Sequence, residues 1–99
     1  MPNAHSPSFV GHYSVEVKVT GSSHYQRSHF KLLANGTAPA PAGVATWSNK
    51  GTTITIVFAP EDEVLTAVQN SVGLSSKQHP GTITLGGSPI AVWYAIKTT

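Results

Sequence analysis

The stretch from residue 52 to residue 74, TTITIVFAPEDEVLTAVQNSVGL, constrains the fold most because it contains two different hydrophobic periodicities. In its first half Ile54, Ile56 and Phe58 stand at alternate positions, which predicts a β-strand. After Pro60, four aliphatic side chains fall within about 100° on a helical wheel, which predicts the core-facing stripe of a helix. These four are Val64, Leu65, Val68 and Val72. The sequence therefore predicts that a strand and a helix meet at Pro60.

Both ends of this predicted helix, at about residues 60–73, have local support. Pro60 suits the first helical turn, where its missing N–H is not needed. The run Glu61–Glu63 holds three of the four acidic residues and would lie at the positive end of the helix dipole. Gly73 suits the left-handed position that often ends a helix. We therefore interpret the acidic run as a helix start rather than as an acid–base or divalent-cation site.

Two strands that form a hairpin are predicted before this stretch. Residues 12–20, HYSVEVKVT, alternate between polar and apolar side chains, as a half-buried strand does. A second strand is expected at residues 25–33. If the turn between them is centred on residues 22–23, Val15 lies opposite Phe30, and apolar side chains meet on the core face.

The outward face of this hairpin is the first candidate site. It collects Glu16, Lys18, Arg27, His29 and Lys31. The same register places Glu16 opposite His29, as an acid–base pair requires, and Lys18 opposite Arg27, which is mildly unfavourable. Lys18, Arg27 or Lys31 would then hold a phosphate group. The alternatives are binding of an anion without chemistry, or the plain solvent face of an amphipathic hairpin.

The rest of the chain is predicted to be strand, turn and loop. Further strands are expected at residues 44–48, 52–59, 82–85 and 90–98, and a loop rich in proline and alanine at residues 35–43. Glycine-containing turns separate these strands, with Gly51 expected in the left-handed conformation. The strands therefore form mostly antiparallel hairpins.

The two tryptophans are the second candidate site. In the last strand the larger apolar side chains, at residues 90, 92, 94 and 96, share one face, which we expect to be the core face. Trp93 then lies on the opposite face. An exposed Trp93 or Trp47 would stack on a sugar ring or anchor a protein contact.

The element order β-β-β-β-α-β-β predicts an α+β fold, in which a mostly antiparallel sheet of about six strands packs on one helix. A β-sandwich with one helical insertion is the alternative. Residues 1–10, which contain Pro2 and Pro7, are expected to form a flexible arm. Residues 11–99 are expected to form a single α+β domain, because 99 residues leave no room for a second core.

Composition narrows the classes of function. Only 10% of the residues are charged and the net charge is +2, which argues against a dedicated nucleic-acid binder. The chain has no cysteine, so it has no disulfide framework and no thiolate nucleophile. We find no signal-peptide pattern and no apolar run long enough to cross a membrane, so we expect a soluble protein without a membrane partner. The cellular location stays open.

No metal site or cofactor is predicted, because the five histidines lack the close spacing of a ligand set and no nucleotide-binding motif is present. The first hypothesis for function is a non-catalytic binding or assembly module with a polar sheet face. It would self-associate as a homo-oligomer, since a short sheet leaves open edges, and its ligand would be a carbohydrate or a protein. The second is a small enzyme for a phosphate-bearing substrate, with His29 and Glu16 as the acid–base pair.

Overall fold

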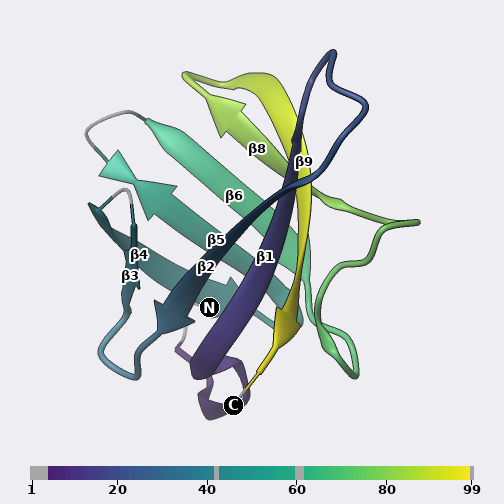
Figure 1. Ribbon diagram of the computed structural model, residues 1–99. Coiled ribbons are helices and arrows are strands. Elements are labelled where there is room, and N and C mark those ends of the chain that lie inside the picture. The colour runs from purple at the N-terminus through teal and green to yellow at the C-terminus, as the bar shows by residue number, and fades with distance from the viewer. Residues whose placement is uncertain (1–4, 42, 60–61, 99) are drawn as a thin grey trace.

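The computed structural model describes residues 5–41, 43–59 and 62–98, which form one nearly closed, barrel-like antiparallel sheet (Figure 1). The strands are β1 (Gly11–Val19), β2 (Gln26–Leu32), β3 (Thr37–Ala40), β4 (Gly43–Lys50), β5 (Thr53–Phe58), β6 (Glu63–Val68), β7 (Gly73–Leu74), β8 (Gly81–Leu85) and β9 (Ser88–Lys97). Their order around the sheet is β2-β1-β9-β8-β6-β5-β4-β3, and β7 pairs with β9 beside this path. The sheet curves until its two end strands, β2 and β3, come near each other.

The prediction of an α+β fold with a helix at residues 60–73 is wrong. Strand β6 occupies much of that range and pairs antiparallel with β5 on one side and β8 on the other. Its β-branched side chains, Val64, Thr66 and Val68, favour an extended backbone. The described residues contain no helix of seven or more residues, and η1, Pro7–Phe9, is a 3₁₀ turn of three. The alternative of a β-sandwich with a helical insertion is wrong for the same reason.

Within the acidic run, Asp62 lies in a turn and Glu63 begins β6, so these two residues do not start a helix. Pro60 and Glu61 lie outside the described residues. Asp62 adopts a positive φ of 53°, which Asp tolerates better than most residues. Its N–H donates to the Ala59 carbonyl at 3.2 Å, and its own carbonyl accepts from the Gly86 N–H at 3.0 Å. These bonds close the β5–β6 turn and join it to the β8–β9 turn.

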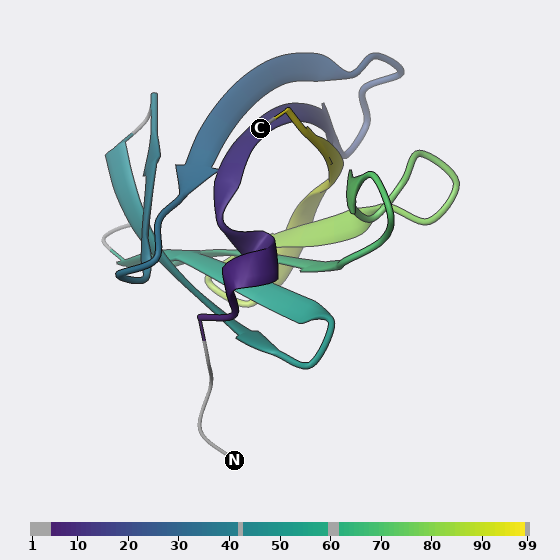
Figure 2. The same ribbon diagram turned by 90° about the horizontal axis from the view of Figure 1, so that it is seen from below.

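The interior of the barrel is a packed core. Its largest fully buried side chains are Trp93, Phe9, Leu32, Ile54, Ile56 and Leu74. Seen from below, η1 crosses one end of the barrel (Figure 2), where Phe9 is 1% exposed. The hydroxyl of Tyr13 donates to the Phe9 carbonyl at 2.7 Å. The inner face therefore stabilises the fold, and a ligand has to be sought on the outer surface.

Strand β9 turns the opposite face inward from the one expected. Ala91, Trp93 and Ala95 are buried, whereas Val92 and Tyr94 are half-buried on the outer side. Both faces of this strand are apolar, so alternation alone does not select one of them. Packing does, because the small Ala91 and Ala95 leave room for the indole between them.

The segment before β1 is joined to the barrel over the part that the structure describes. The backbone N–H of Ser6 donates to Oδ1 of the buried Asn49 at 2.8 Å. The ring of His5 packs edge-on against Trp47, with 5.2 Å between ring centroids. The predicted flexible arm, residues 1–10, thus includes a packed portion at residues 5–10, while residues 1–4 lie outside the described residues.

Candidate functional site

The register of the first hairpin differs from the predicted one by two residues. Tyr13 pairs with Phe30, and Glu16 pairs with Arg27. The chain reverses earlier than expected, because Ser22 N–H donates to Val19 O at 2.9 Å and Gly21 supplies a positive φ of 91°. The predicted Val15–Phe30, Glu16–His29 and Lys18–Arg27 pairings are therefore wrong. A shift of two leaves every side chain on its predicted face, since the side-chain period of a strand is also two.

We call the outer surface of β2, β1 and β9, together with the side chains of Tyr25 and Lys77 that reach it, the hairpin face. Four of the six basic residues of the chain lie on it, and of the three acidic residues that the structure describes only Glu16 does. These basic residues are Lys18, Arg27, Lys31 and Lys77. The other three acidic residues follow β5, at positions 61–63. The hairpin face is therefore the positively charged side of the molecule.

Glu16 is engaged by its cross-strand neighbour. Nε of Arg27 donates to Oε2 of Glu16 at 3.2 Å, with the two side chains 80% and 21% exposed. His29 pairs across the strands with Ser14 instead. Around Ser14 the surface forms a shallow, open hollow of about 400 Å³. The structure thus separates the two side chains that the enzyme hypothesis needs side by side.

Two lysines converge on the ring of Tyr25, just before β2. Nζ of Lys18 lies 5.4 Å from the ring centroid, and Nζ of Lys77 lies 5.6 Å from it. Tyr25 in turn packs edge-to-face on Tyr94 of β9, with 5.4 Å between centroids. Cations at such distances are attracted by the π-system of the ring. We call these four residues the Tyr25 cluster.

The position of Lys77 follows from the pairing around β9. Strand β7 leaves the sheet after Leu74, which pairs with Ala95, and β8 begins at Gly81, which pairs with Trp93. The intervening loop, residues 75–80, therefore projects at the level of Tyr94. Sequence patterns did not single out Lys77, because this placement depends on strand pairings that are distant along the chain. Tyr25 was detectable, since it continues the alternation of Arg27 and His29.

The tryptophans do not form an exposed site. Trp47 is 2% exposed and Trp93 is 0% exposed. The indole N–H of Trp47 donates to the Leu33 carbonyl at 2.8 Å, and that of Trp93 donates to the Thr82 carbonyl at 3.2 Å. Neither ring offers a face to a sugar, so the aromatic surface of the molecule lies at Tyr25 and Tyr94.

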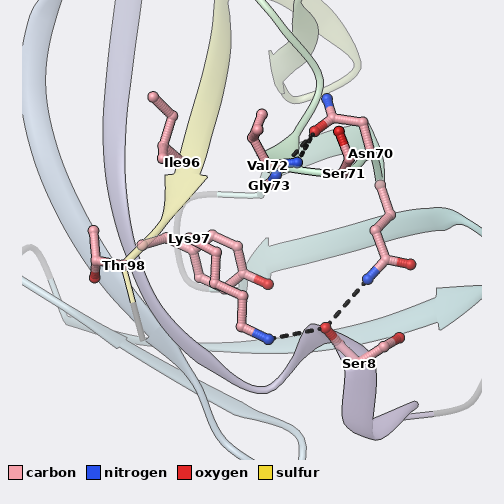
Figure 3. Close-up of a pocket in the computed structure, with 10 residues that line it drawn as sticks. Ser8, Asn70, Ser71, Val72, Gly73, Ile96, Lys97 and Thr98 are labelled. Carbon is pink, nitrogen blue, oxygen red and sulfur yellow. Dashed lines mark hydrogen bonds between the residues drawn. The ribbon is translucent and has the colours of Figure 1, made fainter.

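A larger hollow, of about 700 Å³, opens beside η1 at the end of the barrel (Figure 3). Several of its polar groups are already used within the protein. Nζ of Lys97 and Nε2 of Gln69 both donate to the Ser8 carbonyl, at 3.1 and 3.2 Å. Oδ1 of Asn70 accepts from two backbone N–H groups of the following turn, those of residues 72 and 73. We therefore assign these contacts to the stability of the fold.

Within the described part of the chain, no three histidine or acidic side chains are grouped as a metal site would require. The same residues contain no helix of the length and apolarity needed to cross a membrane. Comparison of the sequence with protein-family models and curated proteins, and of the fold with solved structures, gave no match. The functional argument therefore depends on the geometry of the hairpin face.

Proposed function

We propose that the protein is a non-catalytic binding module that recognises an acidic partner on the hairpin face. The observation that supports this most directly is the Tyr25 cluster. Two ammonium groups approach the same ring, while the one carboxylate of the face, Glu16, is held by Arg27. Like charges repel, and the cost rises where water is partly excluded. An anionic group bound between Lys18 and Lys77 would remove this repulsion.

The shape of the surface favours binding over catalysis. The enzyme hypothesis needs His29 and Glu16 together at one reacting centre, and here His29 lies opposite Ser14. The hollow at Ser14 is shallow and open to solvent, so it does not exclude water from a substrate. Both features suit reversible recognition of a charged surface, which needs accessible charges rather than a closed site.

Self-association belongs to the same proposal. Asp62 is exposed in the β5–β6 turn, and Glu63 follows it. This turn carries acidic residues, whereas the hairpin face carries basic ones. The acidic turn of one copy would therefore be attracted to the hairpin face of another. Such a head-to-tail contact is heterologous, and it closes into a ring or extends as a filament.

The proposal is tested by NMR titration of amide resonances with hexaglutamate at low ionic strength. We expect shifts on β1, β2 and β9 that weaken as salt is added, since screening shortens the reach of exposed charges. The double variant K18Q/K77Q should bind about tenfold more weakly, and K50Q, which removes a charge elsewhere, should bind as the wild type does. A sulfated oligosaccharide and its neutral counterpart test the carbohydrate as partner.

Two results would overturn the proposal. One is the absence of binding to every anionic probe. The other is a loss of affinity that, for each charge removed, is the same in K50Q as in K18Q/K77Q. Such a result would mean that binding depends on net charge alone. Molecular mass measured over a range of protein concentrations tests the self-association, and a mass that stays monomeric would remove that part.

A further inference from the structure

The outer edge of β2 carries no paired strand, and its first half, toward Gln26, is open. Strand β2 stands at one end of the sheet order and pairs with β1 alone. Strand β3 lies beside the second half of β2 without a strand pairing among the described residues, and Leu33, which follows β2, donates its N–H to Thr37 O at 3.0 Å. A free strand edge presents unpaired N–H and C=O groups that another extended chain can use.

Hydrogen bonds of β1 show which residues of β2 face this edge. The carbonyl of His12 accepts from Thr98 N–H, so the even-numbered residues of β1 direct their backbone groups toward β9. The odd-numbered residues therefore bond to β2. Because Tyr13 pairs with Phe30, the backbone groups that bond to β1 are those of the even-numbered residues of β2. The N–H and C=O groups of Arg27, His29 and Lys31 consequently point away from β1. Those of Lys31 lie beside β3, and those of Arg27 and His29 lie toward the open half of the edge.

The first half of this edge is open to solvent. Gln26 and Ser28 carry their side chains on the inner face of β2, yet both are exposed. Nothing in the described residues covers β2 there, whereas Phe30 and Leu32 further along are buried. A strand that adds to β2 would therefore begin at its exposed half.

The edge of β3 that faces β2 is protected against such pairing. Strand β3 has four residues, and its pairing with β4 directs the backbone of Pro39 toward β2. Proline has no N–H to donate, so β3 offers a short and incomplete edge. Strand β2 has no proline in its seven residues. Of the two ends of the sheet, β2 is thus the one that can accept another strand.

Charge on the edge selects the occupant. Arg27, His29 and Lys31 combine outward backbone groups with side chains on the hairpin face. In a strand added beside β2, every second side chain would lie next to these side chains on the hairpin face. A second copy of β2, paired about a two-fold axis at His29, would place Arg27 opposite Lys31 of the partner subunit, which is unfavourable. Acidic residues at alternate positions would instead form opposite-charge pairs.

We propose that the acidic partner is an extended peptide that adds to the free edge of β2 as a further strand. This inference rests on the proposed function and specifies its ligand. Backbone hydrogen bonds to Arg27 and His29 supply affinity, and the alternating acidic side chains, which also reach Lys31, supply selectivity, as in other cases of strand addition. The Tyr25 cluster then contributes attraction at the first end of the edge.

The experiment uses a peptide of alternating threonine and glutamate and two N-methylated versions of it. In one version the methyl groups block the alternate N–H groups on one edge, and in the other they block those on the opposite edge. We expect one version to bind about tenfold more weakly and the other to bind almost as the parent does, because only one edge faces β2. The protein itself is unchanged in this comparison.

Variants of β2 provide the second measurement. H29P removes the outward N–H without removing a bond to β1, and H29A keeps that N–H and removes only the imidazole. We expect H29P to bind at least about tenfold more weakly than H29A, with circular dichroism confirming that both are folded. Should H29P not fold, the N-methylated peptides alone decide the question.

The outcomes separate the two proposals. Equal binding of both N-methylated peptides, with weaker binding to K18Q/K77Q, would overturn strand addition and leave the acidic-partner proposal intact. Absence of binding to the parent peptide and to hexaglutamate would overturn both. A rise in molecular mass that H29P abolishes, with no peptide present, would make a second copy the occupant and would also overturn this inference.

Discussion

The backbone of Gly81 lies against the indole of Trp93, its cross-strand neighbour. A Cβ atom at Gly81 would be 2.9 Å from Nε1 of Trp93 and would also collide with the Thr66 carbonyl. The barrel closes tightly around Trp93 only because this position has no side chain. Sequence patterns gave no sign of this requirement, since Gly81 looks like an ordinary loop residue.

The variant G81A should be destabilised by about 2–3 kcal/mol, as expected for overpacking against atoms that cannot move aside. Urea denaturation monitored by tryptophan fluorescence measures this loss. G51A is the matched control, because a Cβ there meets nothing within 4 Å and only the φ of 60° opposes it. That strain costs about 1–2 kcal/mol, so a larger loss in G51A than in G81A would contradict the close contact.

The stability of the protein should fall between about pH 10 and pH 12. Burial raises the pKa of Tyr13 from 10.0 to about 12. Above pH 10 the unfolded chain therefore releases this proton more readily than the folded one, and unfolding is favoured. The contribution of Tyr13 is complete below pH 10 and is lost as the pH rises through 12.

Comparison of Y13F with the wild type isolates this effect. A pKa difference of two between the unfolded and the folded state corresponds to about 3 kcal/mol. Over this pH range the free energy of unfolding should therefore fall by about 3 kcal/mol more in the wild type than in Y13F. Parallel curves for Y13F and the wild type would show that Tyr13 does not titrate differently in the two states.

Replacing Glu16 should strengthen binding of acidic probes. E16Q removes the one carboxylate of the hairpin face and releases Arg27, so we expect affinity for hexaglutamate to rise about two- to fivefold. Stability should change by less than about 1 kcal/mol, because the ion pair is exposed. E63Q removes an equal charge from the other side of the barrel. An equal gain in E63Q would indicate a general effect of net charge.

Asn49 should hold the segment before β1 in place. Its Oδ1 accepts from Ser6 N–H at 2.8 Å, and its Nδ2 donates to Ser6 Oγ and to the Gly51 carbonyl, both at 3.0 Å. N49A removes these bonds from a position that is 4% exposed, with an expected cost of about 1–3 kcal/mol. Hydrogen exchange at the Phe9 amide should become faster. N35A is the control, since Oδ1 of the exposed Asn35 accepts from the N–H and the hydroxyl of Thr37, within one turn.

The hairpins of this fold were predictable because their signals are local. Alternation in residues 12–20 and 53–58 identifies β1 and β5, and the antiparallel pairing is confirmed. Gly51 has the predicted left-handed φ, of 60°. The helix was wrong because a run rich in valine and threonine also places apolar residues at helical spacing. Pairing of β6 with strands on both sides, which is not local, decides between the two.

The sequence predicted which residues share the outer face of the first hairpin, but it did not predict which of them are in contact. The predicted polar residues do share the outer surface of the first hairpin, since a register shift of two residues leaves each side chain on the same face of the strand. Which of them touch depends on the turn at Gly21, and a shift of two residues exchanged His29 for Arg27 beside Glu16. The pairing of Lys77 with Tyr25 depends on β7 and β8 meeting β9, which no window of sequence contains.

Strands β1 and β9 lie side by side, although β1 is made first and β9 last. During synthesis β1 pairs with β2 at once, but its other edge stays open until residues 88–97 have left the ribosome. Contacts so distant along the chain form slowly, because loop closure is costly. Closure of the barrel therefore has to wait until β9 has been made. The unfinished sheet, with an open edge on β1, is the form most exposed to misassembly with another nascent chain.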